Sequence, residues 1–207
     1  MDWAFLGRGL VIGFSIAAPV GPIGVLCIRR TLSDGRAAGF VSGLGAATAD
    51  ALYGSVAGFG LTAISGVLVG GQAWLRLVGG LVLCYLGLRT LRSRPVEGGA
   101  PGGAALPARG LTGAYATTLV LTLTNPMTII SFAAIFAGLG IAAAQDYGSA
   151  ALLVAGVFTG SALWWFILSG IASSVRGRMR PGSLRWVNLA AGVIITSFGV
   201  LALLSLR

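Results

Sequence analysis

The sequence is poor in charged residues, which make up only 9% of its 207 positions, whereas 56% are hydrophobic. Soluble domains carry about 25% charged residues. A chain with so little charge cannot cover a surface that faces water, but a surface that faces lipid needs no charge. We therefore predict an all-α integral membrane protein. A soluble protein is excluded, and we expect no enzymatic activity.

Histidine is absent, and the two cysteines, Cys27 and Cys84, both lie in apolar runs. This supply is too small for a disulfide framework or a metal centre. The simplest interpretation is that both are free thiols that pack as small hydrophobic residues. We expect no metal and no cofactor.

Lysine is also absent, so the net charge of +9 comes from arginine alone. The arginines form short clusters between long uncharged runs, without the basic stripe of a nucleic-acid-binding face. Eleven lie in the loops after the first, third and fifth predicted helices: Arg29, Arg30, Arg36, Arg89, Arg92, Arg94, Arg109, Arg176, Arg178, Arg180 and Arg185. Three lie on the other side: Arg8, Arg76 and Arg207. By the positive-inside rule, we expect the arginine-rich loops in the cytoplasm and both termini outside, in a protein of the cytoplasmic (inner) membrane.

Charges divide the sequence into hydrophobic blocks, and two of these blocks are too long for a single crossing of about 20 residues, so we predict six helices. The first lacks the basic start and the cleavage pattern of a signal peptide, so it is expected to remain as a helix. The predicted transmembrane helices cover residues 5–28, 37–64, 72–91, 111–140, 147–172 and 184–205.

The chain divides into two similar halves. Residues 1–91 form a first three-helix repeat, residues 92–110 a flexible cytoplasmic loop rich in Pro, Gly and Ala, and residues 111–207 a second repeat. Each half crosses the membrane three times, so the second half must be inverted relative to the first. Inverted repeats are typical of secondary transporters.

The first and fourth predicted helices are interrupted by proline at corresponding places. Pro19 and Pro22 break the first, and Thr124, Asn125 and Pro126 break the fourth. Proline removes a backbone donor and ends a helix, while Asn or Thr followed by proline suits a new helix start. Such a start attracts anionic groups such as a carboxylate. A simple kink is the alternative at either place, but two matched breaks favour a binding site.

Asp50 is the only acidic residue inside a predicted span. A carboxylate at the bilayer centre costs roughly 2.5–3.5 kcal/mol on insertion scales, so such residues usually have a function. Asp50 could exchange a proton or pair with the ammonium group of a substrate. The alternative is a neutral side chain that bonds to Thr48, Tyr53 or the backbone.

Glycine pairs four residues apart predict close contacts between helices. They are Gly9 with Gly13, Gly39 with Gly43, Gly54 with Gly58, and Gly156 with Gly160. These pairs suit packing within the chain or a homodimer interface equally well. Trp164 and Trp165 lie in the middle of a helix, where packing is the simplest role, although one of them could line a cavity.

Together these motifs resemble the LysE/RhtB family of amino-acid exporters. The resemblance runs over about residues 5–205 and includes Ala18-Pro19-Val20-Gly21-Pro22, the arginine-rich segment after it, the Gly43 to Asp50 segment, and Leu123-Thr124-Asn125-Pro126. It implies export of amino acids or related metabolites, driven by proton or cation exchange. It also implies that Pro19, Gly21, Pro22, Asp50, Asn125 and Pro126 matter.

One position departs from the family pattern. Relatives often carry lysine after the Asn-Pro of the fourth helix, where this chain has Met127, so the resemblance leaves the substrate undetermined. Two other functions remain open: a channel or exporter for a non-amino-acid solute or ion, and a membrane thiol-disulfide relay that would use Cys27 and Cys84.

Overall fold

The structure is a computed structural model of the whole chain. It describes residues 2–19, 21–59, 72–92, 110–125, 128–129, 131–132, 147–176 and 181–205. Over these residues the fold is all-helical, without strands. The helices with described bounds are α1 (Ala4–Ala17), α2 (Pro22–Asp34), α3 (Arg36–Gly58), α5 (Gln72–Arg92), α6 (Gly110–Leu123), α8 (Tyr147–Arg176) and α9 (Pro181–Leu204).

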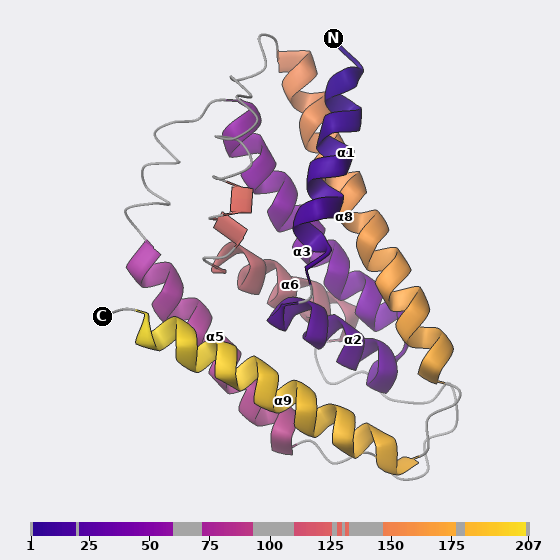
Figure 1. Cartoon of the computed structure of the whole chain (residues 1–207), viewed down its shortest axis with the longest axis vertical. Coiled ribbons are helices and arrows are strands. Elements are labelled where there is room, and N and C mark those ends of the chain that lie inside the picture. Colours follow the sequence, from indigo (N-terminus) through magenta and orange to yellow (C-terminus); the bar gives the residue numbers. More distant parts are fainter. Residues whose placement is uncertain are drawn as a thin grey trace.

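The first predicted helix consists of two helices in the structure. α1 ends at Ala17, α2 begins at Pro22, and their axes are bent by 81° relative to one another. The cause is local, because Pro19 has no N–H with which to continue the hydrogen-bond ladder of α1. Pro22 suits the first position of a new helix, where no donor is needed. Figure 1 shows α2 leaving the end of α1 at this steep angle.

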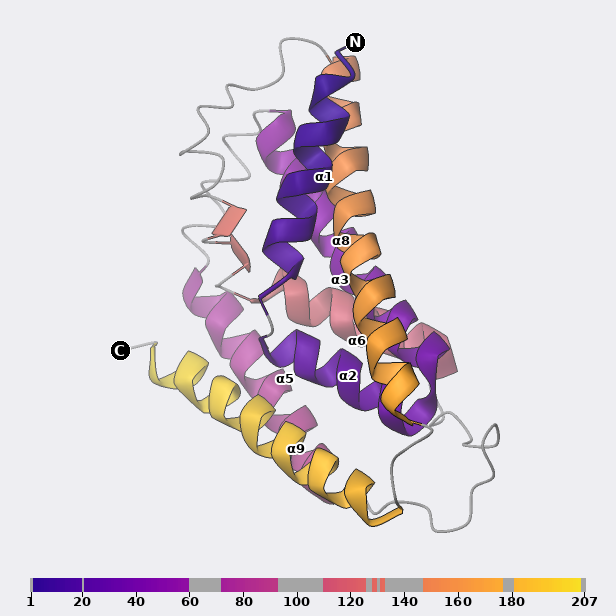
Figure 2. The ribbon, with the colours of Figure 1, turned by 45° about the vertical axis from the view of Figure 1, so that its right-hand side comes forward.

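The helices pack as a bundle and an adjoining pair. α8 lies between α1 and α3, and α6 packs on the other side of α3. α5 and α9 pack against each other, and α2 connects this pair with the bundle through its contacts with α3, α8 and α9 (Figures 1 and 2). The first helix of each predicted half thus packs on a long helix of the other predicted half.

Glycines permit the closest approach, between α1 and α8. A Cβ atom added to Gly9 or Gly13 would overlap the backbone carbonyl of Leu153 or Val157, and one added to Gly160 would overlap that of Leu10. The predicted pairs Gly9/Gly13 and Gly156/Gly160 therefore lie against each other within the chain. The side chains of Ile12, Leu153 and Val157 are buried beside this contact.

Two described helices are long and apolar enough to cross a membrane, namely Tyr147–Arg176 and the Arg185–Leu204 part of α9. The bent pair of α1 and α2 would be a third span if counted as one. The chain is therefore consistent with a membrane protein, while the six-span arrangement and the inverted repeat stay predictions. Of the predicted loop at 92–110, residues 93–109 lie outside the described residues, as do residues 60–71 between α3 and α5.

Candidate functional site

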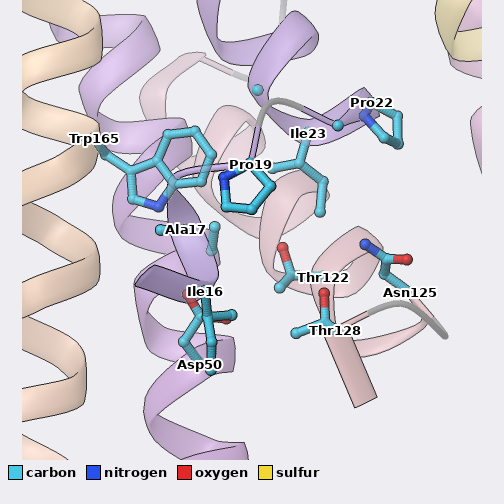
Figure 3. Close-up of a pocket in the computed structure, with 13 residues that line it drawn as sticks. Ile16, Ala17, Pro19, Pro22, Ile23, Asp50, Thr122, Asn125, Thr128 and Trp165 are labelled. Carbon is cyan, nitrogen blue, oxygen red and sulfur yellow. The ribbon is translucent and has the colours of Figure 1, made fainter. Parts of the chain in front are cut away.

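A cavity opens where the two broken helices meet the middle of α3. Its volume is about 70 Å³. Its lining comes from α1 and its break, α2, α3, α6 with the segment after it, and α8, as the close-up in Figure 3 shows. The lining residues are Ile16, Ala17, Pro19, Gly21, Pro22, Ile23, Gly24, Ala46, Asp50, Thr122, Asn125, Thr128 and Trp165. Five residues predicted for the site, from both halves of the chain, are therefore brought together.

The start of α2 forms one wall of the cavity. Gly21 is the N-cap residue and has no side chain to cap the helix, and Pro22 follows at the first helical position. The first helical hydrogen bond runs from Val25 N to Gly21 O, at 3.0 Å. The N–H groups of Ile23 and Gly24 therefore precede the regular ladder, and both residues line the cavity. Such a helix start favours a negatively charged group.

The second break supplies another part of the wall. α6 ends at Leu123, and a new helical turn begins at Asn125, whose carbonyl accepts from the N–H groups of Thr128 (3.1 Å) and Ile129 (3.3 Å). Asn125 thus stands where a helix N-cap would, and it lines the cavity. Thr124 does not line the cavity, and its hydroxyl donates back to Val120 O at 2.9 Å within α6. Pro126 and Met127 lie outside the described residues.

Asp50 is buried at this junction, with only 3% of its surface exposed. Its Oδ2 accepts a hydrogen bond from the Ser161 hydroxyl at 2.7 Å, and Ser161 Oγ in turn accepts from Trp165 Nε1 at 3.2 Å. Ser161 and Trp165 both belong to α8, so one turn of that helix holds the carboxyl group of α3. The partner of Asp50 is thus Ser161 rather than Thr48 or Tyr53.

Removing the Ser161 hydroxyl tests this contact. A hydrogen bond to a charged group contributes about 1.5–3 kcal/mol to stability. We therefore expect Ser161→Ala to lower the thermal unfolding midpoint of the detergent-purified protein. Ser169→Ala is the matched control, because Ser169 is also buried on α8 but donates to Phe166 O of its own helix. Equal midpoints for the two variants would show that the contact between Ser161 and Asp50 does not hold α3 against α8.

A second contact ties α3 to the break after α6. The Tyr53 hydroxyl, one turn beyond Asp50, donates to Leu123 O at 2.6 Å. Leu123 is the last residue of α6, and carbonyls at a helix end need partners from outside the helix. Tyr53 therefore fixes the position of this helix end relative to the Asp50 carboxyl.

Replacing Tyr53 with Phe keeps the ring and removes the donor. A carbonyl left unpaired in a buried place costs about 1–3 kcal/mol. We expect Tyr53→Phe to lower the thermal unfolding midpoint of the detergent-purified protein. Tyr85→Phe should leave it unchanged, because Tyr85 is 62% exposed on α5. If both variants unfolded at the wild-type temperature, Tyr53 would not hold the α6 terminus.

Arginines hold the far end of α2. Arg30 Nη1 donates to Ser42 Oγ (2.8 Å), Ala114 O (2.9 Å) and Thr118 Oγ1 (2.9 Å), so it joins α2 to α3 and α6. Arg29 Nε donates to Asn188 Oδ1 of α9 at 3.0 Å. Both guanidinium groups are therefore engaged within the protein, and neither lines the cavity.

The two cysteines lie on different helices and are free thiols. Cys27 of α2 is buried beside Ala46 and Trp165, whereas Cys84 of α5 packs against Gly199 of α9. This separation gives no support to a thiol-disulfide relay. Among the described residues, no three Cys, Asp or Glu side chains are grouped as metal ligands would be.

Long apolar helices, two broken helices and a buried carboxylate between them place the chain in the class of membrane transport proteins. The chain belongs to the LysE type translocator family, whose model matches residues 14–206. It is 30% identical over 193 residues to a Bacillus subtilis (strain 168) protein named "Putative amino acid efflux protein YcgF". That match covers 92% of this chain and 90% of the relative. No solved structure matches.

Proposed function

We propose that this protein exports amino acids across the cytoplasmic membrane in exchange for protons. The observation that carries the proposal is the buried Asp50 carboxyl in a cavity bounded by the α2 start and the Asn125 break. An amino acid presents one ammonium and one carboxylate group. The ammonium group would pair with Asp50, and the carboxylate would meet the N–H groups at the start of α2.

Exchange with protons follows from the surroundings of Asp50. A buried carboxylate is costly unless it is paired or protonated. Substrate ammonium and proton would therefore occupy Asp50 alternately, so that release of one requires uptake of the other. The name of the Bacillus subtilis relative supports amino acid efflux. Sodium is the alternative coupling ion, and the test below therefore includes a sodium gradient.

The conformational step would be a movement of helix pairs relative to one another. The pairs that would move as units take one helix from each predicted half, α1 with α8 and α6 with α3, because the helices of each pair pack closely on one another. The cavity lies between these pairs. Rocking would open it first to the cytoplasm and then to the outside.

The test is efflux of radiolabelled amino acids from preloaded proteoliposomes, with an imposed pH gradient, with a sodium gradient, and with neither. The proposal expects efflux of one or a few amino acids that a pH gradient accelerates. Liposomes without protein are the control. Release of no amino acid under any condition would contradict the proposed function, and acceleration by sodium alone would replace the proton as coupling ion.

A further inference from the structure

The lining of the cavity has two chemical faces. In Figure 3, Asp50 lies on the same side of the opening as Ile16 and Trp165, and Thr122, Thr128 and Asn125 lie on the other side. Apart from Asp50, the former side is apolar. The latter carries two hydroxyls and an amide. Of the thirteen described residues that line the cavity, Asp50 alone is ionisable.

This charge count matches a zwitterion. The ammonium group of the substrate can pair with the Asp50 carboxylate, and the carboxylate of the substrate can bind at the start of α2. A diamino acid would bring a second ammonium group to a lining whose described residues include no second acid. A dicarboxylic acid would bring a second carboxylate to a lining whose described residues include no cation. In either case a buried charge would remain unpaired, which is strongly unfavourable.

The arginines nearest along the chain do not alter this count. Arg30 Nη1 is already shared among Ser42, Thr118 and the Ala114 carbonyl. Arg29 is bound to Asn188 of α9. Recruiting either for an anionic side chain would break contacts that hold α2 against α3, α6 or α9.

Size limits the substrate further. One water molecule needs roughly 10–15 Å³ of cavity volume, so the observed 70 Å³ has room for on the order of five waters. The ammonium and carboxylate groups of the substrate must share this space with its side chain, so only a compact side chain fits. Ile16, Ile23 and Trp165 would contact it as an apolar wall.

We infer that the substrates are small neutral amino acids, and that amino acids with a charged side chain are excluded. This inference rests on the proposed function, and it names the substrate class of the same site. The single ionisable group, the occupied arginines and the small volume each point to it.

The experiment is exchange in wild-type proteoliposomes loaded in turn with alanine, serine, threonine, valine, lysine, arginine, aspartate or glutamate. Neutral amino acids are expected to exchange at least ~10-fold faster than any charged one, because a buried unpaired charge is costly. Comparable exchange of lysine or glutamate would overturn the inference and leave the proposed function intact. No exchange of any amino acid would overturn both.

A matched variant tests the charge count itself. Asn125→Asp is nearly isosteric, suits the same helix start, and adds a second carboxylate to the cavity wall. Lysine exchange is expected to rise at least ~10-fold over wild type as the added acid pairs with the second ammonium group. Unchanged exclusion of lysine by the folded variant would show that charge pairing does not set the preference. If the variant does not fold, the wild-type panel decides.

Discussion

Asp50→Asn is expected to abolish gradient-driven transport. The amide has the size of the carboxyl group, and its oxygen still accepts from Ser161, so the packing around α3 and α8 should survive. It can neither bind a proton nor pair with an ammonium group. Loss of one member of a buried ion pair costs about 3–5 kcal/mol, so the rate should fall at least ~100-fold. The measurement is efflux from preloaded proteoliposomes whose lumen is either more alkaline or more acidic than the outer buffer.

Asp34→Asn is the matched control for this prediction. Asp34 is the last residue of α2 and does not line the cavity, so the same chemical change there should leave transport near the wild-type rate. Both variants should elute from size exclusion as the wild type does. Full pH-coupled efflux by Asp50→Asn would contradict the role given to the carboxyl group.

Gly13→Ala is expected to destabilise the protein strongly, although it adds only one methyl group. The new Cβ would overlap the Val157 carbonyl oxygen, and backbone cannot rotate away as a side chain would. Overpacking of a side-chain core costs about 1–3 kcal/mol, and an overlap with backbone should lie at the upper end. We expect a clear fall in the thermal midpoint and in the monodisperse fraction in detergent.

Gly7→Ala provides the comparison on the same helix. A Cβ at Gly7 has nothing within 4 Å, and alanine favours a helix over glycine by roughly 1 kcal/mol. Its stability should equal or slightly exceed that of the wild type. If Gly13→Ala were as stable as Gly7→Ala, the close contact between α1 and α8 would not exist in the folded protein.

Features that a single residue type determines were predictable from the sequence. Pro19 lacks the donor that α1 needs, so the chain had to leave the helix near that residue, and it does so after Ala17. The isolation of Asp50 as the one acid in a predicted span made it a candidate site residue, and the structure places it in the cavity lining. In both cases a single residue type carries the physical reason, without knowledge of what lies beside it in space.

Partners across the fold could not be predicted in this way. Ser161 is one of several serines in an apolar helix, and its hydroxyl looks like those that bond back to their own helix. Its contact with Asp50 spans 111 positions of the chain. Likewise, the glycine spacing predicted close helix contacts, but only the structure pairs α1 with α8. Of the neighbouring residues Trp164 and Trp165, the one that lines the cavity is Trp165.

The sequence also could not show which of Thr124 and Asn125 lines the cavity. The place of Thr124 beside Asn125 suggested a residue of the site, because either side chain could cap a helix start. In the structure its hydroxyl donates to Val120 O, within α6, and Asn125 alone of the two lines the cavity. Threonine often bonds to the carbonyl four residues earlier, and the sequence does not tell when this local bond is preferred.

The most direct test of coupling through Asp50 is the luminal pH of proteoliposomes that carry a trapped pH-sensitive dye. An outward gradient of a transported neutral amino acid, without any imposed pH gradient, is predicted to acidify the lumen with the wild-type protein, because protons enter as substrate leaves. Asp50→Asn should give no change in pH. Substrate efflux by the wild type without luminal acidification would contradict the proposed exchange.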